Sequence, residues 1–102
     1  MLSQLTSLRK ELHRFPELSG KEFETAQRIV NFLTPFEPTK IISELGTTGV
    51  AAVYDYGDPE TTIMIRCELD ALPIQEVNTF EYRSVTDSVS HKCGHDGHMV
   101  IV

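Results

Sequence analysis

The spacing of apolar residues changes once along the chain, and this change constrains the fold more than any other feature. In the first third, apolar residues recur every three or four positions, as they do on one face of an amphipathic helix. Beyond Pro35 the spacing becomes close to two, β-branched residues are frequent, and glycine-containing turn signals follow at short intervals. We therefore expect helices followed by strands, in a chain of the α/β class.

Two helices are predicted in the first third. The first ends before Pro16, because a residue that precedes proline disfavours the helical conformation. Its apolar face consists of Leu5, Leu8, Leu12 and Phe15. The second ends at Thr34-Pro35, and its apolar face consists of Phe23, Ala26, Ile29, Val30 and Leu33. Ser19 and Glu22 have the spacing of a capping box, so we expect their side chains to accept hydrogen bonds from backbone N–H groups at the start of this helix.

Three strands joined as a short antiparallel meander are predicted for residues 39–44, 50–56 and 61–66. The connecting turns fall at Gly46–Gly49 and Gly57–Pro59. The segment Ile63–Ile65 is apolar without alternation, which is typical of a strand covered on both faces. We therefore expect the opening part of a mixed sheet with helices on both sides, which is an incomplete domain.

The last residues indicate that the chain continues in a longer protein. Asp96 could cap a helix that begins at Gly97, but the residues that remain are too few for a stable isolated helix. The segment Met99–Val102 is apolar, and no helix-stop signal follows it. We therefore expect an N-terminal piece that is interrupted within a buried helix.

Length and charge limit the number of domains and the class of partner. A chain of 102 residues can bury one modest core, so it is one domain or part of one. Its net charge of −6, with scattered basic residues, argues against nucleic acids and anionic membranes as partners. It has no bilayer-spanning apolar run and no signal-peptide pattern, so we expect a cytoplasmic protein. Cys67 and Cys93 are too few and too far apart for a disulfide framework or a C-x-x-C pair, so each is interpreted as a buried thiol or a metal ligand.

The strongest chemical signal is the segment His91–His98. It holds three of the four histidines, one of the two cysteines and an aspartate. Thiolate and imidazole are ligands that zinc and related divalent metals prefer. Cys93 and His95 would point to the same side of an extended loop, where both could reach one ion or a close pair of ions. Asp96 or His91 could then orient the ligating imidazole from behind.

Each of these residues also has an ordinary interpretation. A single histidine is more often a hydrogen-bonded surface residue, a single aspartate more often a helix cap, and a glycine more often a turn residue. The spacing is not that of a known structural zinc finger, because no second ligand pair completes a tetrahedral site. The cluster as a whole nevertheless favours a metal site. His13 and Glu17, near the end of the first helix, are interpreted as capping or surface groups.

The second chemical signal is the segment Arg66–Pro73, which follows the third predicted strand. Ligand sites of open α/β sheets lie beyond the carboxyl ends of strands, where Glu68 and Asp70 would lie. Taken alone, this segment is explained better by an exposed strand end with a local pair between arginine and carboxylate. Alternation places Cys67 on the opposite, apolar face, so we interpret it as a core residue.

Taken in order, three segments resemble the opening motifs of the metal-dependent amidohydrolases. This family includes the N-acyl-amino-acid amidohydrolases, hippurate hydrolase, N-acetyl-diaminopimelate deacetylase and the plant indole-acetyl-amino-acid hydrolases, among relatives of aminoacylase and the zinc carboxypeptidases. The segments are Leu12–Ser19 with Glu22 and Thr25, Glu68–Ile74 with Glu76, and Cys93–His98. The resemblance runs over nearly the whole chain, and the third motif is the most specific.

The resemblance implies that Cys93 and His95 are the first two metal ligands and that Asp70 supports the metal centre from behind. Family members hold two divalent ions in a complete site, commonly zinc, manganese, cobalt or nickel. They hydrolyse amide bonds of small molecules such as N-acyl amino acids, with metal-activated water and a glutamate as the general base. Full-length relatives are often homo-oligomers.

Four further residues of the matching segments receive weaker assignments. Asp96 and His98 belong to the third motif, in orienting or structural roles. Glu68 stands where many members of this branch carry aspartate and more distant relatives a ligating histidine, and we do not expect it to be a ligand. His91, like His98, is a candidate for a third ligand and otherwise has an orienting or structural role.

The resemblance also implies that this chain holds only part of the active site. In relatives the general-base glutamate, further metal ligands and a lid or dimerisation domain lie beyond the point where this chain stops. Residues 1–102 are therefore expected to form the N-terminal portion of the catalytic metal-binding domain and to be inactive alone. Two alternatives stay open: a small non-catalytic module that binds zinc or nickel, and the poorly folded remnant of a disrupted gene.

Overall fold

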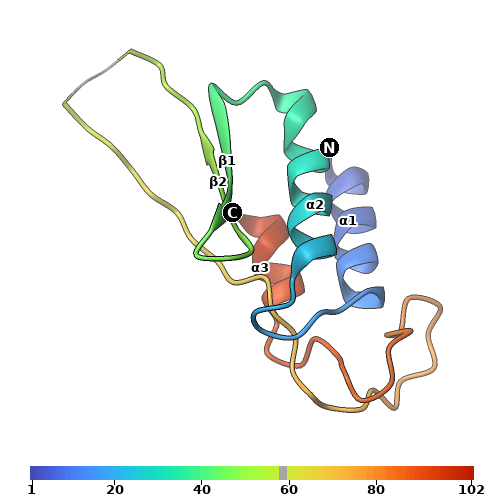
Figure 1. Ribbon diagram of the computed structural model, residues 1–102. Helices are drawn as coiled ribbons and strands as arrows, with labels where there is room; N and C mark the ends of the chain where they lie inside the picture. Colours follow the sequence, from blue (N-terminus) through green and yellow to red (C-terminus); the bar gives the residue numbers. More distant parts are fainter. Residues whose placement is uncertain (58–59) are drawn as a thin grey trace.

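The computed structural model describes residues 1–57 and 60–102, and its elements follow the predicted order of helices and then strands (Figure 1). The elements are α1 (Leu2–Arg14), α2 (Phe23–Leu33), a single 3-10 turn η1 (Thr34–Phe36), β1 (Lys40–Leu45), β2 (Gly49–Val53) and α3 (His95–Ile101). The prediction of the α/β class is therefore confirmed. The boundaries of the first two helices also agree with the positions of Pro16 and Thr34-Pro35.

The core lies where α1 meets α3. Leu8 and Leu12 of α1 are buried against Met99 of α3. The partly buried side chains packed around these three are Ile29, Phe32, Cys67, Leu69 and Val100. The interpretation of Cys67 as a core residue is thus confirmed in part, since its side chain packs against the core but is only half-buried. The expected apolar face of α2 is wrong at Phe23, which is 59% exposed at the first position of the helix.

The N-terminus of α2 is capped by Glu17, and the predicted capping box is wrong. Oε1 of Glu17 accepts hydrogen bonds from Thr25 N at 2.5 Å and from Thr25 Oγ1 at 2.7 Å. The backbone turn from Leu18 to Lys21 separates Ser19 from the helix start, so its hydroxyl makes no cap. Glu22 instead accepts from Gly20 N at 2.5 Å and from the Thr48 hydroxyl, and so ties the β1–β2 turn to α2.

The two strands form an antiparallel hairpin around the predicted turn. The register pairs Lys40 with Val53 and Ile42 with Ala51, and it shifts before the last pair, Leu45 with Gly49. The second strand is shorter than predicted, because pairing stops at Val53. Figure 1 shows α2 beside this hairpin.

The predicted third strand is wrong. Residues 61–66 have no strand pairing, and Ile63, Met64 and Ile65 are 81%, 84% and 71% exposed. A strand needs a neighbour for its backbone groups, and in the described residues the sheet consists of β1 and β2 alone. The expected helical cover on both faces is therefore not formed around this segment. The predicted turn Gly57–Pro59 falls partly on residues 58 and 59, which lie outside the described residues.

The last helix begins two residues earlier than predicted. α3 starts at His95, and Gly94 occupies its N-terminal flanking position with φ of 94°. This left-handed conformation favours glycine, because a Cβ there is strained. Asp96 is therefore the second residue of the helix and does not cap it. Met99 is buried, whereas Ile101 at the end of α3 is exposed.

Candidate metal centre

Two isolated β-bridges hold the segment that contains Asp70 between the first sequence motif and the residues just before the third. Leu18 pairs with Ala71 in parallel, and Leu72 pairs with Ser90 in antiparallel orientation. The hydrogen bond from Ala71 N to Glu17 O is 2.8 Å long. These bridges bring the residues that follow Arg66 next to the start of α3. Asp70 and His95, for example, are 25 residues apart in sequence and yet in contact.

His95 is oriented by Asp70. Its Nδ1 lies 2.9 Å from the backbone oxygen of Asp70 and 3.1 Å from Oδ1 of the same residue. Because a carbonyl oxygen only accepts, Nδ1 carries a proton, and in the neutral ring Nε2 then holds the lone pair. A histidine that donates one ring N–H to a carboxylate or carbonyl has the arrangement found in most metal-ligating histidines. Nε2 lies 3.8 Å from Oε2 of Glu68, which is beyond hydrogen-bond distance.

The two cysteines differ in their suitability as ligands. Cys93 is exposed, next to Gly94 and His95. Burial raises the pKa of the Cys67 thiol, the negative charge of Glu68 raises it further, and Arg66 partly opposes this rise. The thiolate is the form that binds metals, so Cys67 is the poorer candidate. Arg66 also forms the predicted pair with Glu68, at 2.8 Å.

Cys93 and His95 therefore fit the ligand chemistry of a zinc-like divalent ion, but they are not a complete site. Across residues 1–57 and 60–102, no group of three or more His, Cys, Asp or Glu side chains is arranged to hold a metal ion. The ring of His98 lies 5.9 Å from that of His95 and is exposed. A shallow pocket of about 220 Å³ opens beside it, lined by Arg66, Cys67, Glu68, His98, Ile101 and Val102.

The sequence suggested that Asp96 could orient His95, but in the structure the Asp96 carboxylate contacts other groups. Its Oδ2 lies 2.7 Å from His13 Nδ1 and forms an ion pair with Arg9 at 3.1 Å. Its Oδ1 accepts from Gly97 N at 2.9 Å. The carboxylate is thus fully engaged with α1 and with its own helix, and the orienting role falls to Asp70.

His13 is the residue that the sequence interpretation missed. It was expected to be a capping or surface group, yet it is only 4% exposed. Its Nδ1 contacts Asp96, and its Nε2 lies 2.7 Å from Oε2 of Glu76. One local signal points to this role: Arg9 and His13 are four residues apart and therefore share a face of α1.

Glu76 is the second centre of this polar cluster. It accepts hydrogen bonds from Ser84 N at 2.5 Å, Asn78 Nδ2 at 3.0 Å and Lys92 Nζ at 3.2 Å, besides that from His13. Burial by itself raises the pKa of Glu76, but these hydrogen bonds outweigh it and lower the pKa to about 2. The carboxylate is therefore ionised at neutral pH.

His91 is buried next to this cluster, and the orienting role predicted for it is not observed. Neither of its ring nitrogens has a hydrogen-bond partner in the described part of the chain. Its ring lies 6.5 Å from that of His13. Burial lowers the pKa of His91, and the charges of His13 and His95 lower it further against the opposing effect of Asp96 and Asp70.

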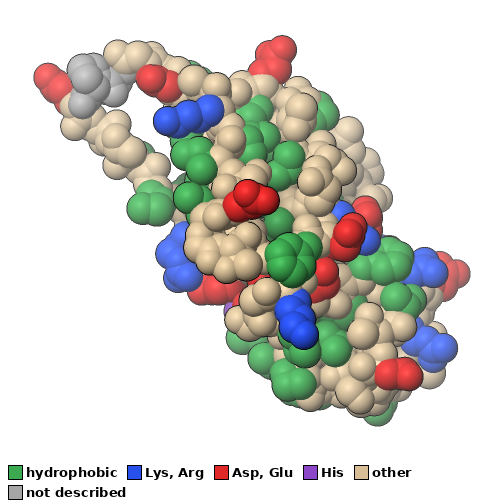
Figure 2. Space-filling view, viewed as in Figure 1, with side chains coloured by type: hydrophobic (Ala, Val, Ile, Leu, Met, Phe, Trp, Pro, Cys, Tyr) green, Lys and Arg blue, Asp and Glu red, His purple; other side chains and the backbone are tan. Residues whose placement is uncertain are grey.

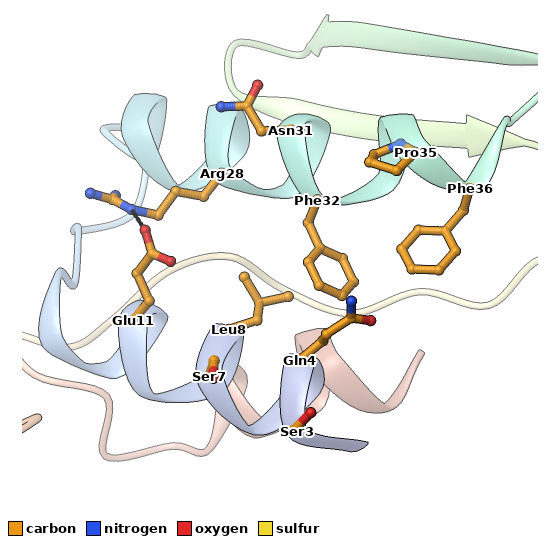
Figure 3. Close-up of a pocket in the computed structure, with 10 residues that line it drawn as sticks. All are labelled: Ser3, Gln4, Ser7, Leu8, Glu11, Arg28, Asn31, Phe32, Pro35 and Phe36. Atoms are coloured by element: carbon orange, nitrogen blue, oxygen red, sulfur yellow. Dashed lines mark hydrogen bonds and ion pairs between the residues drawn. The ribbon is translucent and has the colours of Figure 1, made fainter. Parts of the chain in front are cut away.

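A larger pocket lies elsewhere, between α1 and α2 (Figure 3). It has a volume of about 580 Å³, and Leu8 and Phe32 face it. The ion pair between Arg28 and Glu11, 3.1 Å long, crosses one end. None of the candidate metal ligands lines this pocket. We therefore do not assign the metal centre to it, although it is the larger of the two pockets.

The distribution of surface charge and the length of the helices can be compared with the expectation that nucleic acids and membranes are not partners. On the face shown in Figure 2, Lys and Arg side chains are dispersed among Asp and Glu rather than gathered in one patch. None of the described helices has the length and the apolar run that crossing a bilayer requires.

Comparison with known proteins relates the chain to hydrolases. No protein-family model matches it. It is 45% identical over 97 residues to an uncharacterized hydrolase of Staphylococcus haemolyticus, an alignment that covers 95% of this chain and 24% of the relative. It is 37% identical over 98 residues to N-acetyldiaminopimelate deacetylase of Bacillus pumilus, covering 96% of this chain and 26% of the relative.

A solved structure shares the fold. The crystal structure of a Bacillus subtilis protein, described as a dinuclear metal-binding peptidase of the M20 family, superposes with a TM-score of 0.88. The two are 36% identical, and the match covers 96% of this chain and 27% of that one. The chain therefore spans about a quarter of the length of these relatives.

Proposed function

The chain is a homologue of the metal-dependent amidohydrolases and M20 peptidases over about a quarter of their length, and we propose that it carries half of the metal site of such an enzyme. In this proposal Cys93 and His95 are metal ligands and Asp70 is the residue that orients His95. The substrate class is the amide bond of N-acyl amino acids. The segment by itself binds a metal ion and does not hydrolyse amides.

The observation that carries the proposal is the pair of hydrogen bonds from His95 Nδ1 to Asp70. They fix the ring orientation and leave Nε2 as the atom free to bind a cation. The exposed thiol of Cys93, two residues earlier, supplies a second ligand of the type that zinc, cobalt and nickel accept.

The proposed site assigns metal binding and ligand orientation to different residues of the chain. A bound divalent ion polarises an amide carbonyl and lowers the pKa of water, which is the chemistry that amide hydrolysis needs. Cys93 and His95 would hold such an ion, and the Asp70 carboxylate would stabilise the His95 tautomer that binds it. A catalytic zinc site uses about three protein ligands and a separate general base. With two ligands, the chain is expected to be inactive alone.

The metal-binding part of the proposal is tested by Co²⁺ titration of the purified chain. We expect an absorption band from thiolate–cobalt charge transfer, with about one ion bound per chain. The substitution Cys93→Ala should abolish the band, whereas the matched substitution Cys67→Ala should leave it. A chain that binds no Co²⁺, or one whose band depends on Cys67, would contradict the assignment.

The substrate class is tested in a chimera. This chain replaces the homologous quarter of the Bacillus pumilus deacetylase, and release of amino acid from N-acetyl amino acids and from hippurate is measured. We expect activity in the chimera and its loss on Cys93→Ala. Activity of the isolated chain towards either substrate would refute the half-site, and an inactive but folded chimera would refute the substrate class.

A further inference from the structure

The ring of His13 in α1 is buried between the carboxyl groups of two acidic residues. Its ring nitrogens lie 2.7 Å from Oδ2 of Asp96 and 2.7 Å from Oε2 of Glu76. The ionised Glu76 carboxylate only accepts hydrogen bonds, so Nε2 of His13 donates to it. Such charge-assisted hydrogen bonds are stronger than those between neutral groups.

These two carboxylates connect His13 to both ends of the segment that contains the proposed ligands. Asp96 directly follows His95. Lys92, which directly precedes Cys93, donates to the same Oε2 atom of Glu76 that His13 contacts, at 3.2 Å. Through Glu76 and Asp96, His13 is therefore linked to a side chain on each side of residues 93–95.

Aromatic side chains close over this cluster. The rings of Phe80 and Tyr82 stack at 4.2 Å, and their centroids lie 5.7 and 5.8 Å from that of His13. They limit the access of water to the hydrogen bonds of His13, which are stronger in a less polar environment. The cluster lies where α1, the loop around Glu76 and the start of α3 meet (Figure 1).

We propose that His13 is a positioning residue for the metal centre: it fixes the backbone of residues 92–96 and thereby the directions from which Cys93 and His95 bind the ion. The inference rests on the proposed function. His13 contacts neither metal nor substrate in this proposal and acts through Asp96, Glu76 and Lys92. Residues that support ligands from behind change metal affinity by about 10- to 100-fold when they are replaced.

The first test measures Co²⁺ affinity and the cobalt absorption bands of the full chain carrying His13→Gln. Glutamine replaces only one of the two ring nitrogens, so we expect affinity to fall about 10-fold and the ligand-field bands to shift. Circular dichroism checks that helix content is unchanged. The matched control is Thr25→Val, which removes another buried hydrogen bond to a carboxylate, that with Glu17, and should leave the affinity and the bands unchanged.

A second measurement needs no metal. The amide of His98 closes the first turn of α3 through a 3.0 Å hydrogen bond to Gly94 O. We expect its hydrogen exchange to be about 10-fold faster in His13→Gln than in Thr25→Val. If the unaltered chain binds no Co²⁺, the proposed function fails, and the exchange rates still decide whether His13 positions the segment.

The proposal is overturned if folded His13→Gln retains both the Co²⁺ affinity and the exchange rate of the unaltered chain. If His13→Gln does not fold, Arg9→Met replaces it. This substitution removes the ion pair that a partly exposed side chain makes with Asp96. It should change both readouts in the same direction and by less, and unchanged values would likewise overturn the proposal.

Discussion

His95 and Asp70 are 25 residues apart in sequence, yet Nδ1 of His95 donates to both the backbone oxygen and Oδ1 of Asp70, at 2.9 and 3.1 Å. The contact joins the segment Arg66–Pro73 to the segment His91–His98. It determines which ring nitrogen is free, and it is the most direct structural argument for a metal ligand at position 95.

Replacing Asp70 by alanine should weaken metal binding about 10- to 100-fold, because the His95 ring loses its side-chain acceptor and becomes free to change tautomer. The dissociation constant for Zn²⁺ is measured by competition with a chromophoric chelator. The control is Asp87→Ala, the same substitution at an exposed position. Equal affinities in the two variants would contradict the orienting role of Asp70.

Replacing Glu17 by alanine should lower the free energy of unfolding by about 1–3 kcal/mol, because the backbone N–H and the hydroxyl of Thr25 lose their acceptor at the start of α2. Urea unfolding followed by circular dichroism measures the change. Glu81→Ala at an exposed position should stay within about 0.5 kcal/mol of the unaltered chain. A similar small effect in Glu17→Ala would show that its carboxylate is not the cap.

The pKa of Glu76 predicts an acid-dependent loss of stability. The pKa is lowered from an ordinary value of 4.5 to about 2 in the folded chain, so the unfolded state binds the proton first as pH falls. The stabilisation is complete above about pH 4.5 and is lost as pH falls towards 2. Urea unfolding at a series of pH values should show this loss, and Glu76→Gln should have a flatter profile between these limits. Parallel profiles for the two chains would refute the assignment.

Replacing Leu12 by alanine should lower the free energy of unfolding by about 2–5 kcal/mol, because this side chain is 1% exposed in the core between α1 and α3. The matched substitution Leu2→Ala, at a side chain that is 78% exposed on the same helix, should cost less than about 0.5 kcal/mol. Thermal and urea unfolding of the two variants provide the comparison. Similar losses would place the core elsewhere.

The sequence predicted those elements whose causes are local. Pro16 and Thr34-Pro35 end helices by restricting the backbone of their neighbours, and the turn Gly46–Gly49 joins two strands that pair with each other. The candidate ligands also lie close together in sequence, in the segment His91–His98. Spacing and residue type were therefore enough to single them out.

Other features depend on groups that are distant in sequence. The apolar segment Ile63–Ile65 reads as a buried strand, but a strand exists only where a neighbour pairs with its backbone, and none does so within the described residues. Glu17 rather than Ser19 caps α2, because the chain turns before the helix and brings the longer side chain to Thr25.

The amino-acid sequence by itself determined the two helices, the hairpin and the grouping of candidate metal ligands near residue 95, because each follows from neighbours along the chain. Only the tertiary structure decided that Asp70 orients His95 and that His13 is a buried link. His13 meets partners 83 and 63 residues away, Asp96 and Glu76. Such hydrogen bonds leave no periodic pattern in the sequence, since they form only when packing of the core brings α1, the loop around Glu76 and α3 together.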